Sequence, residues 1–233
     1  MPASPEPNGL FVTGTGTGVG KSIVAASIIA ALSASGHRVA AFKPVVTGLD
    51  EPDPMWPLDH VLLSAATGWQ TPERVTPYTF GPAASPHLAA ELDDMRIEPT
   101  ILRGAYQRSS EGADLIVCEG VGGLMVPLST APPYSVLDLI KQFALPVVVV
   151  AHPELGTISD TRLTVDRLRA ERIPVRGVVL SPWPAKPSRI HDSNRKTIEQ
   201  LCEIEVHVLA ATTPGALAEA GASLPVERWV GSQ

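Results

Sequence analysis

The chain has 233 residues, of which 44% are hydrophobic and 18% charged, and its formal net charge is −6. A chain of this length buries a core of its own, and its 19 glycines and 23 prolines are too few for a low-complexity or collagen-like sequence. The acidic balance excludes the general basic surface that holds nucleic acid or an anionic membrane, so we expect neither as a partner.

Strands and helices are predicted to alternate along the chain. In chain order we expect a strand at residues 10–13, a helix at 21–35, a strand at 38–42, helices at 58–66 and 99–108, strands at 115–118 and 147–151, a helix at 159–170, and strands at 175–180 and 206–209. Strands such as VVVV at 147–150 lack polar alternation, which is typical of a parallel sheet with helices on both faces. The proline-rich stretches 52–57 and 182–187 are predicted loops.

Cysteine usage and targeting signals favour a cytoplasmic location. Cys118 and Cys202 show neither Cys-x-x-Cys nor Cys/His ligand spacing, which argues against disulfides and zinc. The longest strongly apolar run, residues 144–151, is too short for a bilayer, and the first eight residues, MPASPEPN, lack the features of a signal peptide. We expect residues 1–8 to be a disordered tail and residues 9–233 to form a single α/β domain.

A glycine-rich segment, GTGTGVGKS at residues 14–22, joins the first predicted strand to the first predicted helix. In this context the backbone N–H groups of the loop bind phosphate oxygens, Lys21 reaches the β- and γ-phosphates, and the Ser22 hydroxyl suits Mg²⁺. The usual spacing has Gly where this chain has Thr15, so the loop is one residue wider. Spacing of the glycines does not fit a dinucleotide-binding turn. The sequence thus predicts a P-loop NTPase-like, doubly wound, mostly parallel sheet.

Two further charged residues follow predicted strands. Lys43 ends the second strand before Pro44, and Glu119 follows residues 115–118 and precedes a Gly-Val-Gly-Gly run. Because ligands of open parallel sheets bind at the carboxyl ends of the strands, these residues should converge with Lys21 at one rim. Two lysines there would neutralise charge in phosphoryl transfer, and a carboxylate would hold magnesium.

Four motifs, FVTGTGTGVGKS, FKPVVTG, PYTFGPAASPHLAA and CEGVGG, resemble in their order and spacing the dethiobiotin synthetase family of biotin synthesis. The resemblance implies a P-loop homodimer that uses Mg²⁺ and ATP, or another nucleoside triphosphate. It also implies that the substrate 7,8-diaminononanoate captures CO₂, supplied as bicarbonate, as a carbamate. The carbamate attacks the γ-phosphate, and the second amine closes the ureido ring to give dethiobiotin, ADP and phosphate.

The same resemblance implies roles for individual residues. The catalytic residues are Lys21, Lys43 and Thr17, and the metal ligands are Ser22, Asp59 and Glu119. The implied nucleotide-binding residues are Gly16, Thr17, Gly18, Val19, Gly20, Lys21, Ser22, Ile23, Glu119, Gly120, Val121, Gly122 and Ser181, and the substrate-binding residues are Thr17, Lys43, Thr47, Gly156 and Ser159.

Several points stay open at this stage. Asp59 is favoured as a metal ligand because it opens a helix, but it would also serve as a plain helix cap, and Asp50 or Asp53 would reach the same space. The resemblance places residues 155–159 over the substrate of a partner subunit. Where relatives carry an Asn-Asp pair that reads the purine, this chain has Ser181-Pro182 and then Trp183, which leaves base specificity undetermined.

The alternative function is a P-loop switch ATPase or a nucleotide-binding scaffold. A partition-type switch ATPase carries an additional lysine five residues before the P-loop lysine, and this chain has Gly16 there. An ATP-dependent amidotransferase would need a glutaminase domain, for which too little chain remains.

Overall fold

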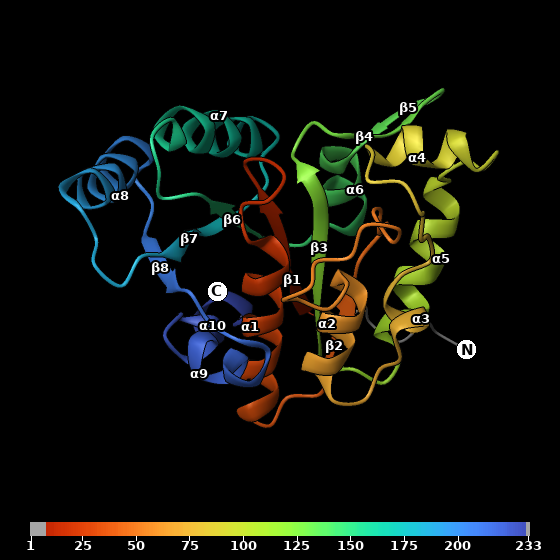
Figure 1. Ribbon diagram of the computed structural model, residues 1–233, viewed down its shortest axis with the longest axis horizontal. Helices are drawn as coiled ribbons and strands as arrows, with labels where there is room; N and C mark the ends of the chain where they lie inside the picture. The colour runs from red at the N-terminus through yellow and green to blue at the C-terminus, as the bar shows by residue number, and fades with distance from the viewer. Residues whose placement is uncertain (1–7, 232–233) are drawn as a thin grey trace.

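The fold is a six-stranded sheet with helices on both faces (Figure 1), seen in a computed structural model that describes residues 8–231. The strand order is β2-β3-β1-β6-β7-β8, and every neighbouring pair in this sheet is parallel. β1 therefore lies at the centre, with the loop that follows it between β3 and β6. The predicted tail lies outside the described residues except for Asn8, which begins β1.

The bounds of the elements are as follows. The strands of the main sheet are β1 (Asn8–Gly14), β2 (Val39–Phe42), β3 (Leu115–Gly123), β6 (Val147–Ala151), β7 (Val175–Trp183) and β8 (Val206–Ala210), and β4 (Pro127–Thr130) and β5 (Pro133–Ser135) form an antiparallel hairpin. The helices are α1 (Lys21–Ala34), α2 (Asp59–Thr67), α3 (Pro72–Val75), α4 (Pro86–Leu92), α5 (Pro99–Ser110), α6 (Val136–Phe143), α7 (Thr157–Ala170), α8 (Arg189–Cys202), the 3₁₀ turn η1 (Pro214–Ala216), α9 (Leu217–Ala222) and α10 (Val226–Val230).

Alternate side chains of each strand enter two separate cores. Leu10 and Val12 of β1 pack with α1, α2, α9 and α10, whereas Phe11 packs with α4, α5, α6, α7 and α8. This division explains the uninterrupted apolar runs of the strands, because both faces of the sheet are covered and neither needs polar residues. The doubly wound parallel architecture predicted from the sequence is confirmed.

The structure differs from the prediction mainly in short elements and strand ends. Helices α3, α4, α6, α8, α9 and α10 and the β4–β5 hairpin were not predicted. β3 runs on through the glycines to Gly123, which pairs with Gly14, and β7 runs on through Pro182 to Trp183, which pairs with Ala210. Glycine and proline usually end strands, but here the neighbouring strand supplies a partner and extends the ladder.

No helix within residues 8–231 combines the length and the apolar character needed to cross a membrane.

Candidate active site

The glycine-rich loop lies where the sequence predicts it, between the end of β1 and the start of α1. Thr15 N–H donates to the carbonyl oxygen of Val150 on β6 at 3.0 Å and anchors the start of the loop. Gly18 and Gly20 have φ of 73° and 88°, values that only glycine adopts without strain. Gly20 caps α1 without any side-chain hydrogen bond, so the first N–H groups of α1 remain available to an anion.

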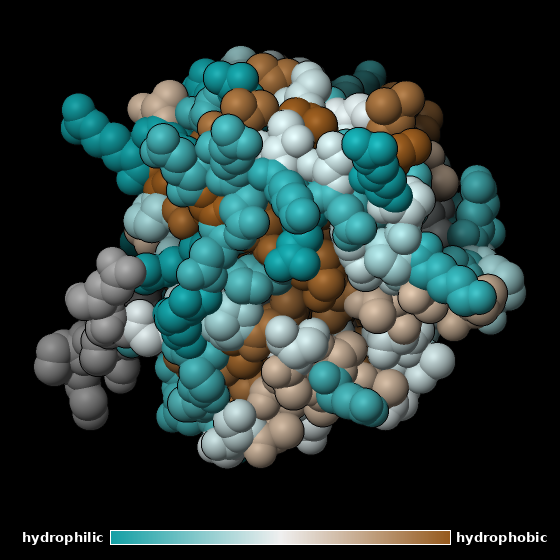
Figure 2. Space-filling view, turned by 90° about the vertical axis from the view of Figure 1, so that its left-hand side faces the viewer, coloured by the Kyte–Doolittle hydropathy of each residue, from teal (hydrophilic) through white to brown (hydrophobic). Residues whose placement is uncertain are grey.

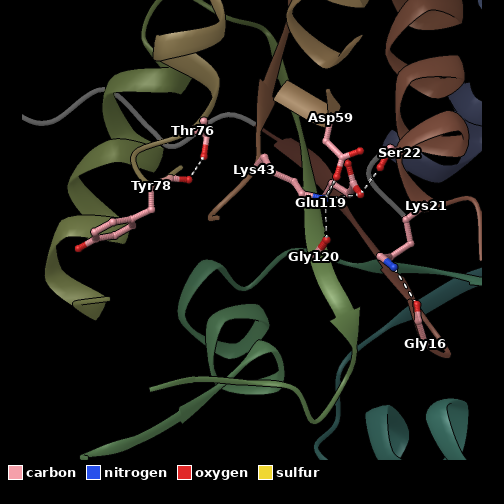
Figure 3. A network of polar contacts seen from close by, with 9 residues as sticks. All are labelled: Gly16, Lys21, Ser22, Lys43, Asp59, Thr76, Tyr78, Glu119 and Gly120. Carbon is pink, nitrogen blue, oxygen red and sulfur yellow. Dashed lines mark hydrogen bonds and ion pairs between the residues drawn. The ribbon is translucent and has the colours of Figure 1, made fainter. Parts of the chain in front are cut away.

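Lys21 begins α1, and its side chain folds back over the loop. Its Nζ donates to the carbonyl oxygen of Gly16 at 2.8 Å, which closes the loop into a ring (Figure 3). Burial is the largest cause that lowers the pKa of Lys21, and repulsion from Lys43 is the second; together they bring it to about 8. A phosphate group at the loop would replace the carbonyl as the partner of this ammonium and would favour its charged form.

Lys43 lies just beyond β2 and forms the centre of a charge cluster in which Glu119 is buried and Asp59 is partly exposed. Its Nζ is 2.8 Å from an Asp59 carboxylate oxygen and 2.6 Å from Glu119 Oε1, and its side chain is only 3% exposed. It also donates to the carbonyl oxygen of Gly120 at 3.3 Å, and its backbone N–H donates to the carbonyl oxygen of Val75. Figure 3 shows the three charged side chains converging from three different elements.

Glu119 connects this cluster to the glycine-rich loop. Its Oε1 accepts a hydrogen bond from the Ser22 hydroxyl at 2.8 Å as well as the one from Lys43, and its side chain is completely buried. Burial raises the pKa of Glu119 above its ordinary value, and Lys43 offsets this only in part. The Glu119 Oε2 atom is buried without a hydrogen-bond partner, so the carboxylate has a free ligand position.

Asp59 and Lys43 hold each other in their charged forms. Burial acts to raise the pKa of Asp59, but the ammonium of Lys43 outweighs it and the pKa is lowered. Burial alone would lower the pKa of Lys43, but the carboxylates of Asp59 and Glu119 raise it, and the net result is a raised pKa. Asp59 is the first residue of α2, and its carboxylate pairs with Lys43 and also accepts from the Ser22 hydroxyl, which further lowers its pKa.

The donor set of Ser22, Asp59 and Glu119 fits a magnesium ion that also binds phosphate oxygens and water. Within residues 8–231, no three His, Cys, Asp or Glu side chains are grouped as a metal site, and a magnesium ion would therefore need ligands from the nucleotide. The unpartnered Glu119 Oε2 and the Ser22 hydroxyl beside it are suitable hard oxygen donors. Asp53, the alternative ligand, uses Oδ1 to accept from the backbone N–H of Met55 at 2.7 Å.

These groups open into a cavity of about 700 Å³. Its walls include most of the residues implied by the resemblance, namely Thr17, Gly18, Gly20, Lys21, Ser22, Ile23, Lys43, Thr47, Asp59, Glu119, Val121 and Gly122. Much of its remaining wall comes from residues 51–53, 56–58 and 83–86, of which only Asp53 was considered as a site residue from the sequence. The quoted motif PYTFGPAASPH contains residues 83–86 and was the available signal for them.

The other residues implied by the resemblance lie around this cavity or away from it. Val19 packs into the core with residues of α1. The Ser181 side chain lies so close to Gly20 that a Cβ atom added to Gly20 would be 3.0 Å from the Ser181 Oγ. Gly156 and Ser159 line a separate shallow groove along α7 and not the cavity. Within one subunit they do not join the residues of the P-loop.

Comparison of the sequence with those of known proteins identifies the family of this chain. A family model described as an AAA domain matches residues 8–213. The ATP-dependent dethiobiotin synthetase BioD of Thermodesulfovibrio yellowstonii is 34% identical over 204 residues, which cover 84% of this chain and 85% of that protein. The enzyme of the same name from Bacillus licheniformis is 35% identical, with 84% of this chain and 82% of that protein covered. The chain belongs to the ATP-dependent dethiobiotin synthetases. As a member of this family, it is an ATP-dependent ligase of biotin biosynthesis.

Solved structures agree on the fold of this dethiobiotin synthetase family member. A ParA family ATPase from Chlorobium tepidum superimposes with a TM-score of 0.54 at 15% identity, covering 97% of this chain and 92% of that one. Cyanthece McdA gives a TM-score of 0.54 at 10% identity, covering 95% and 92%. These likenesses show the P-loop α/β architecture alone, and the lysine typical of partition ATPases is replaced here by Gly16.

Proposed function

We propose that this protein converts 7,8-diaminononanoate, CO₂ and ATP into dethiobiotin, ADP and phosphate. The observation that carries the proposal is the buried Lys43, held between Asp59 and Glu119 beside the glycine-rich loop. A P-loop that only binds nucleotide needs no second buried lysine. A reaction in which an anionic carbamate attacks a phosphate does need a fixed positive charge there.

In this proposal one group of cavity residues binds the nucleotide and magnesium, and another binds the substrate. Residues Gly16 to Ile23, with Glu119 to Gly122 and Ser181 around them, bind the nucleotide, and the start of α1 faces its phosphates. Ser22, Asp59 and Glu119 hold magnesium, which when bound neutralises charge on the phosphate oxygens. Lys21 keeps its proton against the β- and γ-phosphates.

Lys43, Thr17 and Thr47 act on the substrate. One amine of the diamine captures CO₂ as a carbamate, whose negative charge Lys43 and the Thr17 hydroxyl stabilise. A carbamate oxygen then forms a bond to the γ-phosphorus while the bond to ADP breaks. The second amine attacks the carbonyl carbon of this mixed anhydride, phosphate leaves, and the ureido ring closes. Thr47 lines the same cavity and hydrogen-bonds the substrate.

The active form is proposed to be a homodimer in which residues 155–159 bind the carboxylate tail of the partner's substrate. Leu155, just before α7, and Leu163, within α7, are 92% and 68% exposed, and the exposed Leu201 of α8 lines the same groove as Leu163. Figure 2 looks onto the side of the molecule that carries α8 and β8, where apolar surface is exposed between hydrophilic areas. A second subunit would cover this apolar surface and would bring Gly156 and Ser159 to a cavity they do not reach within their own chain.

Incubation with MgATP, bicarbonate and 7,8-diaminononanoate tests the proposal. We expect the mass of dethiobiotin to appear, with phosphate released only when all three reactants are present. The absence of dethiobiotin from a protein that binds nucleotide would overturn the proposal. A switch ATPase, the alternative, would release phosphate in response to a protein partner and not to the diamine.

A further inference from the structure

The Glu51 carboxylate is a charged group of the cavity wall that the proposed mechanism leaves unused. Of the acidic side chains lining the cavity, Asp59 and Glu119 pair with Lys43, and Asp53 accepts from the Met55 N–H. Among the residues that the structure describes, no hydrogen-bond or ion-pair partner of the Glu51 carboxylate is found. Glu51 is thus a free negative charge at the cavity.

The backbone that presents Glu51 is held firmly. Gly48, Leu49 and Asp50 donate their N–H groups to the carbonyl oxygens of Pro82, Phe80 and Gly81 at 3.0, 3.2 and 3.0 Å. The Glu51 N–H then donates to the carbonyl oxygen of Gly48 at 3.1 Å, which closes a turn directly after Thr47. Gly48 enters this turn with φ of +85°, a conformation that favours glycine. The carboxylate is therefore carried by a pinned turn beside a residue assigned to the substrate.

A free carboxylate is unfavourable beside a site for a triphosphate unless a cation lies between them. Like charges that share a cavity repel, whereas an ammonium placed between two anions is stabilised by both. The cavity's own cations do not fill this role, because Lys43 already pairs with two carboxylates and Lys21 is directed to the Gly16 carbonyl. A cationic group of a bound ligand would supply the charge that the lysines of the cavity do not.

We propose that Glu51 binds a protonated amino group of the diamine substrate and so determines which end of that substrate enters the cavity. This inference rests on the proposed function. An alkyl diamine with a carboxylate tail is positive at one end and negative at the other, and Glu51 attracts the first and repels the second. The orientation leaves one amine to react with CO₂ and brings the carbamate toward Lys43.

The test compares Glu51→Gln with Asp50→Asn in the full chain. Both variants remove one carboxylate charge from the same turn and keep the shape of the side chain, but Asp50 does not line the cavity. We expect Glu51→Gln to raise the KM for 7,8-diaminononanoate roughly three- to tenfold, with the KM for MgATP unchanged, because a single charge-assisted contact at an exposed position is lost. Asp50→Asn should behave as wild type.

The salt dependence of the KM for the diamine distinguishes a charge contact of Glu51 from a purely structural role, which would leave this dependence unchanged. Added salt should raise the diamine KM of the wild type more than that of Glu51→Gln, because salt screens a charge pair that the variant lacks. A diamine KM within twofold of wild type, an equal rise in the KM for MgATP, or an equal effect of Asp50→Asn would overturn the role of Glu51. An inactive wild type would instead overturn the proposed function, which keeps the two failures distinct.

Discussion

At the scale of single residues, substitution of Lys43 should affect both catalysis and stability. We expect Lys43→Ala to reduce turnover at least about a thousandfold while the Kd for ADP changes less than about threefold, because the proposed role of Lys43 is to act on the carbamate and the moving phosphoryl group. Isothermal titration with ADP and a steady-state assay measure the two effects. A loss of nucleotide affinity as large as the loss of rate would contradict the assigned role.

The Lys43→Ala variant should also be less stable, so a control is needed that separates the loss of stability from the loss of catalysis. Removing Lys43 leaves the fully buried Glu119 without its counter-charge, at a cost of about 3–5 kcal/mol in the free energy of unfolding. The double variant Lys43→Ala/Glu119→Gln should recover much of this stability in urea unfolding because the buried charge is gone. It should stay inactive.

The proposed metal ligands predict a change in magnesium requirement. Glu119→Gln and Asp59→Asn each remove a charge from an oxygen donor while preserving its shape, so the Mg²⁺ concentration for half-maximal rate should rise about tenfold or more. Asp53→Asn is the matched control, because the Asp53 carboxylate is bound to the Met55 N–H. If Asp53→Asn shifts the magnesium titration and Asp59→Asn does not, the assignment of the ligand is wrong.

His207 predicts a loss of stability on mild acidification. Burial lowers the pKa of His207 even though Glu205 is 3.2 Å away, and its ring packs edge-on against Trp229. Just below the ordinary pKa of histidine, the unfolded chain therefore binds more protons at this position than the folded chain, and stability falls as the pH drops from 7 to 5. His207→Gln should give a shallower dependence in urea unfolding, whereas parallel curves for the two proteins would exclude this contribution.

At the scale of the elements, the end of β7 is the place where the family resemblance puts the contacts to the base of the nucleotide. Ser181 is buried against Gly20, Pro182 has no N–H, and Trp183 packs against the core and His191. None of them offers the paired donor and acceptor of an amide side chain, which a site needs in order to reject the wrong base. In the proposed binding mode the phosphates, by contrast, contact the whole glycine-rich loop.

We therefore expect CTP, GTP and UTP to support turnover with kcat/KM within about tenfold of ATP, a difference of about 1.4 kcal/mol. Measurement of kcat/KM for the four nucleotides checks this. A preference for ATP beyond about a thousandfold would show that another segment, such as residues 210–214, reads the adenine.

At the scale of the whole molecule, the proposed shared site makes activity depend on assembly. We expect sedimentation velocity to show a dimer at assay concentration. Leu163→Glu, which puts a charge on the exposed face of α7, should shift the protein toward monomer and lower activity in proportion. Ile101→Glu is a suitable control, because Ile101 is similarly apolar and exposed but lies on α5. A fully active monomer would exclude the shared site.

The sequence alone determined the architecture and the phosphate end of the site. Uninterrupted apolar strands alternating with helical patterns indicated a covered parallel sheet, and the position of the glycine-rich segment between a strand and a helix indicated the loop at its rim. Lys43 and Glu119 were located in the same way, because the carboxyl ends of parallel strands meet at one edge. Such features are local or follow from topology, so they can be read without coordinates.

Only the tertiary structure decided which charges meet. Asp59, Asp53 and Asp50 belong to one proline-rich stretch and its following helix, and the one local feature that favours Asp59, its place at the start of the predicted helix, fits a plain helix cap equally well. Packing of α2 brings Asp59 to 2.8 Å from Lys43, whereas Asp53 turns to its own backbone. The extended ends of β3 and β7 and the free carboxylate of Glu51 likewise depend on segments distant in the chain. The physical reason is that such contacts are set by long-range packing and pairing, which a local sequence pattern does not encode.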